Sequence, residues 1–87
     1  MGIFLRYMYC VYTVECADKT LYTGSTCDLE KRIHEHNCTK AGAKYTRGRR
    51  PVKLVYSVKC KSFSEARKKE GEIKRLTREE KIDLFKN

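Results

Sequence analysis

Three stretches of the chain have the density or alternation of apolar residues that is typical of β-strands. The first, Tyr7 to Glu15, consists almost entirely of aromatic, β-branched and sulfur-containing residues, which favour extended backbone. A plausible turn over 16–19 separates it from Thr20 to Gly24, and the two segments are expected to pair as a hairpin. The third, Val52 to Cys60, alternates apolar and polar positions. The pattern predicts a three-stranded antiparallel sheet.

Helical spacing of apolar residues begins after the second strand. An N-cap candidate near Thr26 to Asp28 opens a helix that runs to about His36. The following segment, Cys38 to Pro51, has no apolar period and is predicted to be a long basic loop.

The C-terminal third of the chain contains two helix-start signals. Ser62-Phe63-Ser64-Glu65 matches a capping box and begins a helix to about Leu76. Thr77-Arg78-Glu79-Glu80 matches a second one and begins a short last helix. The predicted order is therefore β-β-α-β-α-α, an α+β fold with helices flanking the sheet.

Length and composition restrict the class of protein. Eighty-seven residues favour a single domain spanning 1–87, and no apolar run approaches the roughly 18 residues that cross a membrane. The five cysteines are odd in number and form no CxxC pair, which favours reduced thiols in a cytoplasmic protein. Cysteine and histidine spacing around 27–38 matches no structural zinc pattern.

Positive charge is concentrated in one part of the chain. The formal net charge is +9, and the segment from Lys31 to Lys53 has eight Lys or Arg residues against one acid, Glu35. A basic stripe of this kind favours a polyanionic partner, here DNA. The segment has no apolar face, so membrane-surface binding is not expected. The alternative is a solvated loop that maintains solubility.

One carboxylate falls where the helix pattern predicts an apolar residue. In the helix after Ser62, the positions at helical spacing are Phe63, Ala66, Glu70 and Ile73. A carboxylate in a core-facing stripe is costly unless it is paired or binds a metal. Glu70 could pair with Lys74 one turn later, or it could serve a site.

Other polar groups are expected near the same place. Tyr12 and Tyr22 lie on the two strands of the hairpin, and Arg32 and His36 share one helix face because they are four residues apart. Each is ordinary by itself. Together with Glu70 they offer two phenols, a guanidinium, an imidazole and a carboxylate, which can serve phosphodiester hydrolysis.

At these residues the sequence resembles the GIY-YIG nuclease superfamily, and in particular its small stand-alone members. The matching elements run from Tyr9 to Phe85 and are Cys10-Val11-Tyr12, Tyr22-Thr23-Gly24, Arg32, His36-Asn37 and Glu70. Cys10 replaces a frequent glycine of the first motif, and Thr23 replaces a frequent aliphatic residue of the second. Both are backbone or packing positions.

The resemblance implies a DNA endonuclease that uses one divalent metal, Mg²⁺ or Mn²⁺. Tyr12 would deprotonate or position the attacking water, with His36 as its neighbour or as a competing base. Tyr22 would position the phosphate or water, Arg32 would stabilise the pentacovalent phosphate, and Glu70 would hold the metal. A turn at Gly24 would bring the helix close to the hairpin.

The basic segment would contact DNA. Its candidate residues are Lys44, Tyr45, Arg47, Arg49 and Arg50. A chain this short should show low sequence specificity or a preference for DNA structure, or should take its specificity from a protein partner or a dimer; DNA repair is one process it would serve. The competing hypothesis is a non-catalytic nucleic-acid-binding module on a nuclease fold.

Overall fold

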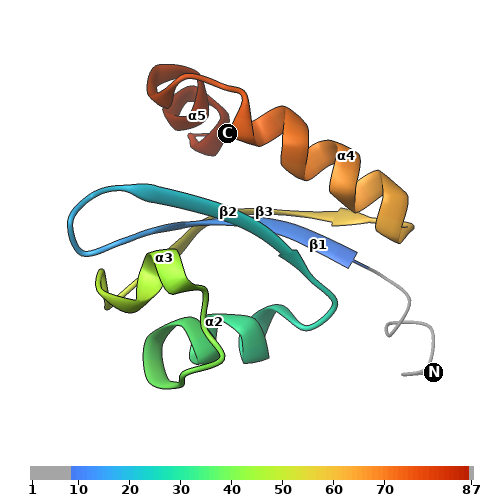
Figure 1. The fold of residues 1–87 in the computed structure, drawn as a ribbon. Coiled ribbons are helices and arrows are strands. Elements are labelled where there is room, and N and C mark those ends of the chain that lie inside the picture. The colour runs from blue at the N-terminus through green and yellow to red at the C-terminus, as the bar shows by residue number, and fades with distance from the viewer. Residues whose placement is uncertain (1–8, 87) are drawn as a thin grey trace.

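The computed structural model describes residues 9–86 and confirms the α+β class and the predicted order, with one additional short helix, α3 (Figure 1). The elements are β1 (Tyr9–Glu15), β2 (Leu21–Thr26), α2 (Leu29–Cys38), α3 (Lys44–Arg47), β3 (Lys53–Cys60), α4 (Phe63–Lys74) and α5 (Arg78–Phe85). Tyr7, the predicted start of the first strand, lies outside the described residues.

The three strands form an antiparallel sheet in the order β2-β1-β3, with β1 in the centre. Helices α4 and α5 cover one face of the sheet, and α2 and α3 cover the other (Figure 1). Strand β1 is therefore buried on both faces, which explains why its sequence does not alternate between apolar and charged residues.

Two small cores result from this arrangement. On the α4 face, Val11 packs with Cys60, Ala66 and Ile73. On the α2 face, the buried cluster consists of Tyr12, Val14, Cys16 and Val52. Successive residues of β1 thus point to opposite cores, as the period of a strand requires.

The predicted alternation of the third strand is wrong at Leu54, which is 42% exposed. A bulge between Thr13 and Val14 shifts the register of β1 against β3, so that Leu54 pairs with Val14. Tyr56 and Val58 still pack on the α4 face. The bulge changes which face the strand's residues occupy, and no local sequence pattern indicates it.

The helix-start signals are confirmed to different degrees. Both reciprocal bonds of the capping box are present at Thr77 and Glu80. At the start of α4, Ser62 accepts a hydrogen bond from the Glu65 amide. The Glu65 carboxylate, however, accepts from the Lys61 amide at 2.9 Å, so only half of the predicted box forms.

The basic segment after α2 is compact rather than an open loop. Gly42 is buried directly against α2: a Cβ at this position would lie 2.6 Å from the Glu35 carbonyl oxygen and 2.8 Å from the His36 Cα. The Arg50 guanidinium donates to the backbone carbonyls of Glu35, His36 and Thr39. Carbonyls at a helix end lack partners within the helix, although that of Glu35 also accepts from the Thr39 amide at 3.2 Å. A cation beside them is also favoured by the helix dipole.

A side-chain amide fastens the end of this segment. Asn37 Oδ1 accepts from the Val52 amide at 2.7 Å, and Asn37 Nδ2 donates to the Val52 carbonyl at 3.1 Å. Over residues 9–86, no helix has the length and apolarity to span a bilayer.

Substitution of Gly42 by alanine is expected to lower the free energy of unfolding by about 1–3 kcal/mol, because the new methyl group would collide with helix backbone that cannot move aside. Urea denaturation measures this change. Gly48 is the matched control, since a Cβ there meets nothing within 4 Å, and Gly48→Ala should change the value by about 0.5 kcal/mol or less. Equal effects of the two substitutions would contradict the described packing.

Candidate active site

A buried hydrogen bond joins the first strand to the first helix. Tyr12 Oη lies 2.7 Å from His36 Nε2, and the two residues are 1% and 0% exposed. Their rings meet edge to face with centroids 5.7 Å apart. The spacing of four residues places Arg32 one turn before His36 on α2, as the sequence predicts.

Gly24 makes room for this bond. It lies inside β2 directly opposite Tyr12, so the predicted glycine turn is wrong. A Cβ on Gly24 would lie 2.8 Å from Tyr12 Oη and 3.0 Å from its Cζ. The absence of a side chain therefore lets the phenol of Tyr12 lie across the neighbouring strand.

Tyr22 completes an aromatic group around His36. Its ring contacts the imidazole edge to face with centroids 5.4 Å apart, and it stacks on Tyr45 of α3 with centroids 5.8 Å apart. The guanidinium of Arg49 lies 4.1 Å from the centroid of Tyr45. Tyr45 is 39% exposed, so the outer end of this aromatic group reaches the surface.

Arg32 lies beside the tyrosine–histidine pair. Its Nη1 donates to Glu35 Oε1 and to the Ala41 carbonyl oxygen, both at 2.9 Å. Its positive charge opposes the rise that burial causes in the pKa of Tyr12 and adds to the fall that burial causes in the pKa of His36. The guanidinium is thus held in place from one side while its field acts on the two buried rings.

Glu70 comes from α4, on the other face of the sheet (Figure 1). Its side chain is 18% exposed, and its Oε2 accepts a hydrogen bond from Lys74 Nζ at 2.7 Å. This is the i, i+4 pair considered above as the alternative. Burial is the main cause of the raised pKa of Tyr12, and the negative charge of Glu70 adds the smallest contribution to it. The described contacts of Glu70 are with Lys74 and not with Tyr12.

The buried pair has opposite pKa shifts. Burial raises the pKa of Tyr12 above its ordinary value of 10.0, and Arg32 opposes this only in part. Burial lowers the pKa of His36 below 6.5, and the charges of Arg32 and Arg50 lower it further while Glu35 raises it. At neutral pH the pair therefore consists of a neutral phenol and a neutral imidazole.

A metal would have one carboxylate at this place. Within residues 9–86 no group of three or more His, Cys, Asp or Glu side chains converges on a point. The donor set fits Mg²⁺, which commonly binds one or two carboxylates together with water and substrate phosphate. Glu70 is the residue that would hold it, and Lys74 would have to release the carboxylate.

Most cations of the predicted DNA-contacting set are bonded within the chain. Arg47 donates to the Lys40 carbonyl, and Arg49 pairs with Asp18 and donates to the Tyr45 carbonyl. Arg50 uses its Nε and Nη2 donors at the end of α2. Lys44 is exposed.

Thr46 belongs to this site but was not among the residues predicted from the sequence. This α3 residue is 0% exposed, and its Oγ1 lies 2.9 Å from His36 Nδ1. A threonine inside a polar, basic segment has no local signal that would indicate burial. Only the folding of α3 against α2 places it under the imidazole.

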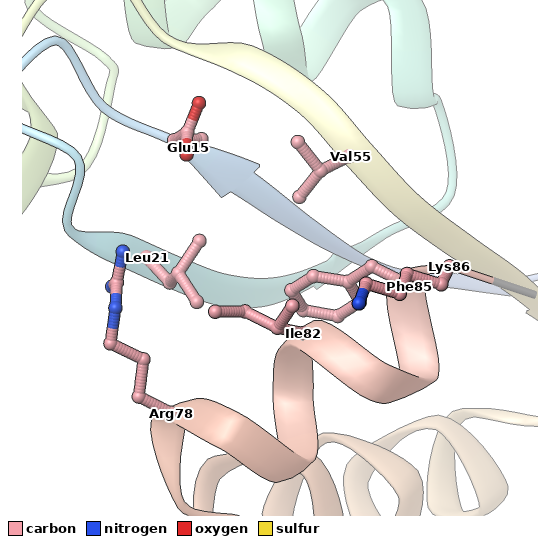
Figure 2. A pocket seen from close by; sticks show the side chains of 7 residues that line it. All are labelled: Glu15, Leu21, Val55, Arg78, Ile82, Phe85 and Lys86. Carbon is pink, nitrogen blue, oxygen red and sulfur yellow. The ribbon is translucent and has the colours of Figure 1, made fainter.

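A cavity of about 330 Å³ lies elsewhere, between the sheet and α5 (Figure 2). Its lining contains none of the predicted site residues; it consists of Glu15, Leu21, Val55, Arg78, Ile82, Phe85 and Lys86. The candidate active site, the cluster around Tyr12, therefore lies outside this cavity.

The free energy of unfolding is expected to fall as the pH decreases from about 6.5 toward 5. His36 is neutral when folded and its pKa is lowered, so the unfolded chain binds one more proton in this range, at a cost of at most about 1.4 kcal/mol per pH unit. Urea denaturation at several pH values measures the slope. The control is His34→Gln, an exposed position, which should retain the loss. Stability that does not change over this range would contradict a neutral His36.

The family model for the GIY-YIG catalytic domain matches residues 8–83. A UPF0213 protein from Syntrophus aciditrophicus is 55% identical over 76 residues, covering 87% of each chain. A UPF0213 protein from Halobacterium salinarum is 50% identical over 78 residues, covering 90% of this chain and all of its relative.

Two solution NMR structures are also similar. The UPF0213 protein BH0048 from Bacillus halodurans is 44% identical with a TM-score of 0.57, covering 88% of this chain and 81% of that one. The protein EF2693 from E. faecalis is 36% identical with a TM-score of 0.59, covering 88% and 82%. Together with the motif residues gathered around Tyr12, these matches show that the chain belongs to the GIY-YIG catalytic domain family.

Proposed function

We propose that this protein is a metal-dependent DNA endonuclease that hydrolyses phosphodiester bonds. The observation that carries the proposal is the buried contact between Tyr12 and His36, with Arg32 beside it. A phenol in direct contact with a neutral imidazole can activate water, and a fixed guanidinium can stabilise charge on a phosphate.

In the proposed reaction the phenol and the imidazole transfer the proton in sequence. The attacking water gives a proton to Tyr12 Oη while Tyr12 passes its own proton to His36 Nε2, 2.7 Å away. The new O–P bond forms as the P–O bond to the leaving oxygen breaks, and that oxygen takes a proton from solvent. The protonated His36 then gives its extra proton to solvent, which restores the neutral imidazole. Tyr12 stays neutral because it gains one proton as it loses the other, and the lowered pKa of His36 keeps the imidazole unprotonated at neutral pH, so that its lone pair can accept.

The remaining residues orient the phosphate. Arg32 would donate to its non-bridging oxygens, and Tyr22 would hydrogen-bond the phosphate or the water. A divalent metal bound at Glu70 would neutralise charge that develops on the phosphoryl group. Release of Glu70 from Lys74 is then part of substrate binding.

The DNA would approach over the exposed end of the aromatic group. Tyr45 and Lys44 are exposed there, and both could contact DNA without breaking a described hydrogen bond of their side chains. Arg47, Arg49 and Arg50 would contact it only through donors left over from their internal bonds. So few free groups suit low sequence specificity or recognition of DNA structure, with a protein partner or dimer supplying any further selectivity.

The ion pair between Glu70 and Lys74 favours one competing function, a nucleic-acid-binding module without catalysis. In that case the carboxylate serves only helix α4. An endonuclease would lose cleavage when Glu70 is substituted, whereas a binding module would show no cleavage that depends on Glu70.

Cleavage of supercoiled plasmid with Mg²⁺ or Mn²⁺ is expected, and Tyr12→Phe, Arg32→Lys and Glu70→Gln should each lower its rate about 100-fold or more. Matched controls are Tyr56→Phe, a tyrosine that packs on Phe85, and Glu72→Gln, an exposed carboxylate of α4. Both controls should cleave at the wild-type rate. Cleavage that survives all three site substitutions would contradict the proposal. So would a wild-type protein that cleaves none of duplex, nicked, flapped or branched DNA.

Removal of the Lys74 ammonium should help metal binding if Glu70 is the metal ligand. Lys74 is 52% exposed, and exposed pairs contribute only about 0.2–1 kcal/mol. Lys74→Met should therefore lower the Mg²⁺ concentration for half-maximal cleavage about two- to fivefold.

Lys68→Met is the control for the Lys74 experiment, because it removes one exposed charge from the same helix outside the pair. A similar shift in both variants would show a general charge effect and not a role for Glu70.

A further inference from the structure

The hydrogen bonds of His36 differ on its two ring nitrogens. Nε2 faces Tyr12 Oη at 2.7 Å, and Nδ1 faces Thr46 Oγ1 at 2.9 Å. A neutral imidazole has a proton on one nitrogen and a lone pair on the other. The partner that fixes the proton on one side therefore decides whether Tyr12 donates to the histidine or accepts from it.

Thr46 has a second partner that restricts its choice. Its Oγ1 lies 3.0 Å from the Ala43 carbonyl oxygen, which can only accept a hydrogen bond. If the hydroxyl proton is donated to Ala43, the threonine oxygen is free to accept, and the only proton facing it is one on His36 Nδ1. Three bonds of 2.7–3.0 Å then run in one direction from Tyr12 to Ala43.

The opposite arrangement keeps the 3.4 Å bond from the Ala43 amide to Nδ1, which a proton on Nδ1 excludes, but it satisfies Tyr12 less well. It would direct the Thr46 hydroxyl to Nδ1 and share that lone pair with the Ala43 amide at 3.4 Å, close to the outer limit for a hydrogen bond. The Ala43 carbonyl would keep its bonds from the Thr46 and Arg47 amides. The imidazole N–H, however, would have to donate to the phenol oxygen, and the hydroxyl proton of the buried Tyr12 would then face no acceptor among the described hydrogen bonds. A phenol is the stronger acid and an imine nitrogen is the stronger acceptor, so the O–H···N direction is preferred at Tyr12 as well.

We propose that Thr46 is a positioning residue that fixes His36 with its proton on Nδ1 and its lone pair on Nε2, facing the Tyr12 hydroxyl. The catalytic consequence rests on the proposed function: only this tautomer can take the proton of Tyr12 while Tyr12 takes one from water. The second partner of His36 thus belongs to α3, in the basic segment predicted to contact DNA.

Thr46 can act in this way because it cannot move. Its side chain is 0% exposed, and its own amide donates to the Ala43 carbonyl at 3.1 Å. The neighbouring Gly42 packs on the α2 backbone at the level of His36. The Thr46 hydroxyl is therefore fixed relative to the imidazole by a backbone hydrogen bond and by the packing of this segment on α2.

The tautomer can be read directly from the full-length ¹⁵N-labelled protein. Two-bond ¹H–¹⁵N correlation spectra at neutral pH distinguish a protonated Nδ1 from a protonated Nε2, and His34→Gln assigns the two rings. The wild type should show the Nδ1–H form of His36. Thr46→Ser should retain it, and Thr46→Val, which has nearly the same shape without the hydroxyl, should give a mixture or the Nε2–H form.

Thr13→Val is the matched control. Thr13 is also 0% exposed and shares a 2.8 Å hydroxyl–hydroxyl bond with Thr23, so the variant removes an equivalent buried hydroxyl away from His36. It should leave the tautomer unchanged. Wild-type His36 in the Nε2–H form would overturn the proposal even if Thr46→Val fails to fold, and an unchanged Nδ1–H form in folded Thr46→Val would overturn it too.

Plasmid cleavage distinguishes the proposed endonuclease activity from the role of Thr46 in orienting the His36 ring. Thr46→Val should cleave about tenfold or more slowly than wild type while Thr46→Ser recovers most of the rate, because proton transfer by a positioned group contributes about 10²–10⁴-fold. The expected tautomers without cleavage in any variant would contradict the proposed function and support the role of Thr46 in orienting the ring. Cleavage at equal rates in Thr46→Val and Thr46→Ser would overturn the positioning role.

Discussion

The buried hydrogen bond between Tyr12 and His36 is the contact on which the rest of this small protein depends. It joins residues 24 positions apart, and both are removed from water. Leaving either group without its partner would cost about 1–3 kcal/mol. This is a large share of the total free energy of unfolding of a small domain. Gly24 is needed so that the phenol can cross β2, and Thr46 is needed so that the far side of the imidazole is also satisfied.

The basic segment after α2 also has a structural role, because it surrounds His36. A high density of lysine and arginine suggests a surface for a polyanion, yet Arg47 and Arg49 bind backbone carbonyls and a carboxylate of this chain. Arg50 binds the end of α2, and Asn37 binds the strand that follows. The segment therefore holds His36 in position, and its free surface for DNA is reduced to groups such as Lys44 and Tyr45.

Features that depend on neighbouring residues could be predicted from the sequence, and features that depend on distant ones could not. The box at Thr77 forms as predicted because both of its partners are within one turn. The pairing of Arg32 and His36 on one helix face follows from their spacing alone. Glu65 is a local exception, because its carboxylate binds the Lys61 amide and not that of Ser62. By contrast, the exposure of Leu54 depends on a bulge in the pairing of β1 with β3, and the partner of His36 in α3 is set by tertiary packing.

Glu70 has the least direct connection to the other proposed catalytic residues. Its side chain contacts Lys74, and only its charge acts on Tyr12. Paramagnetic broadening by Mn²⁺, recorded by NMR with a non-cleavable DNA duplex bound, measures which residues surround the metal. Signals of Glu70, Tyr12 and His36 should broaden together and recover in Glu70→Gln. Broadening that leaves Tyr12 and His36 unaffected would contradict a single site shared by the carboxylate and the tyrosine–histidine pair.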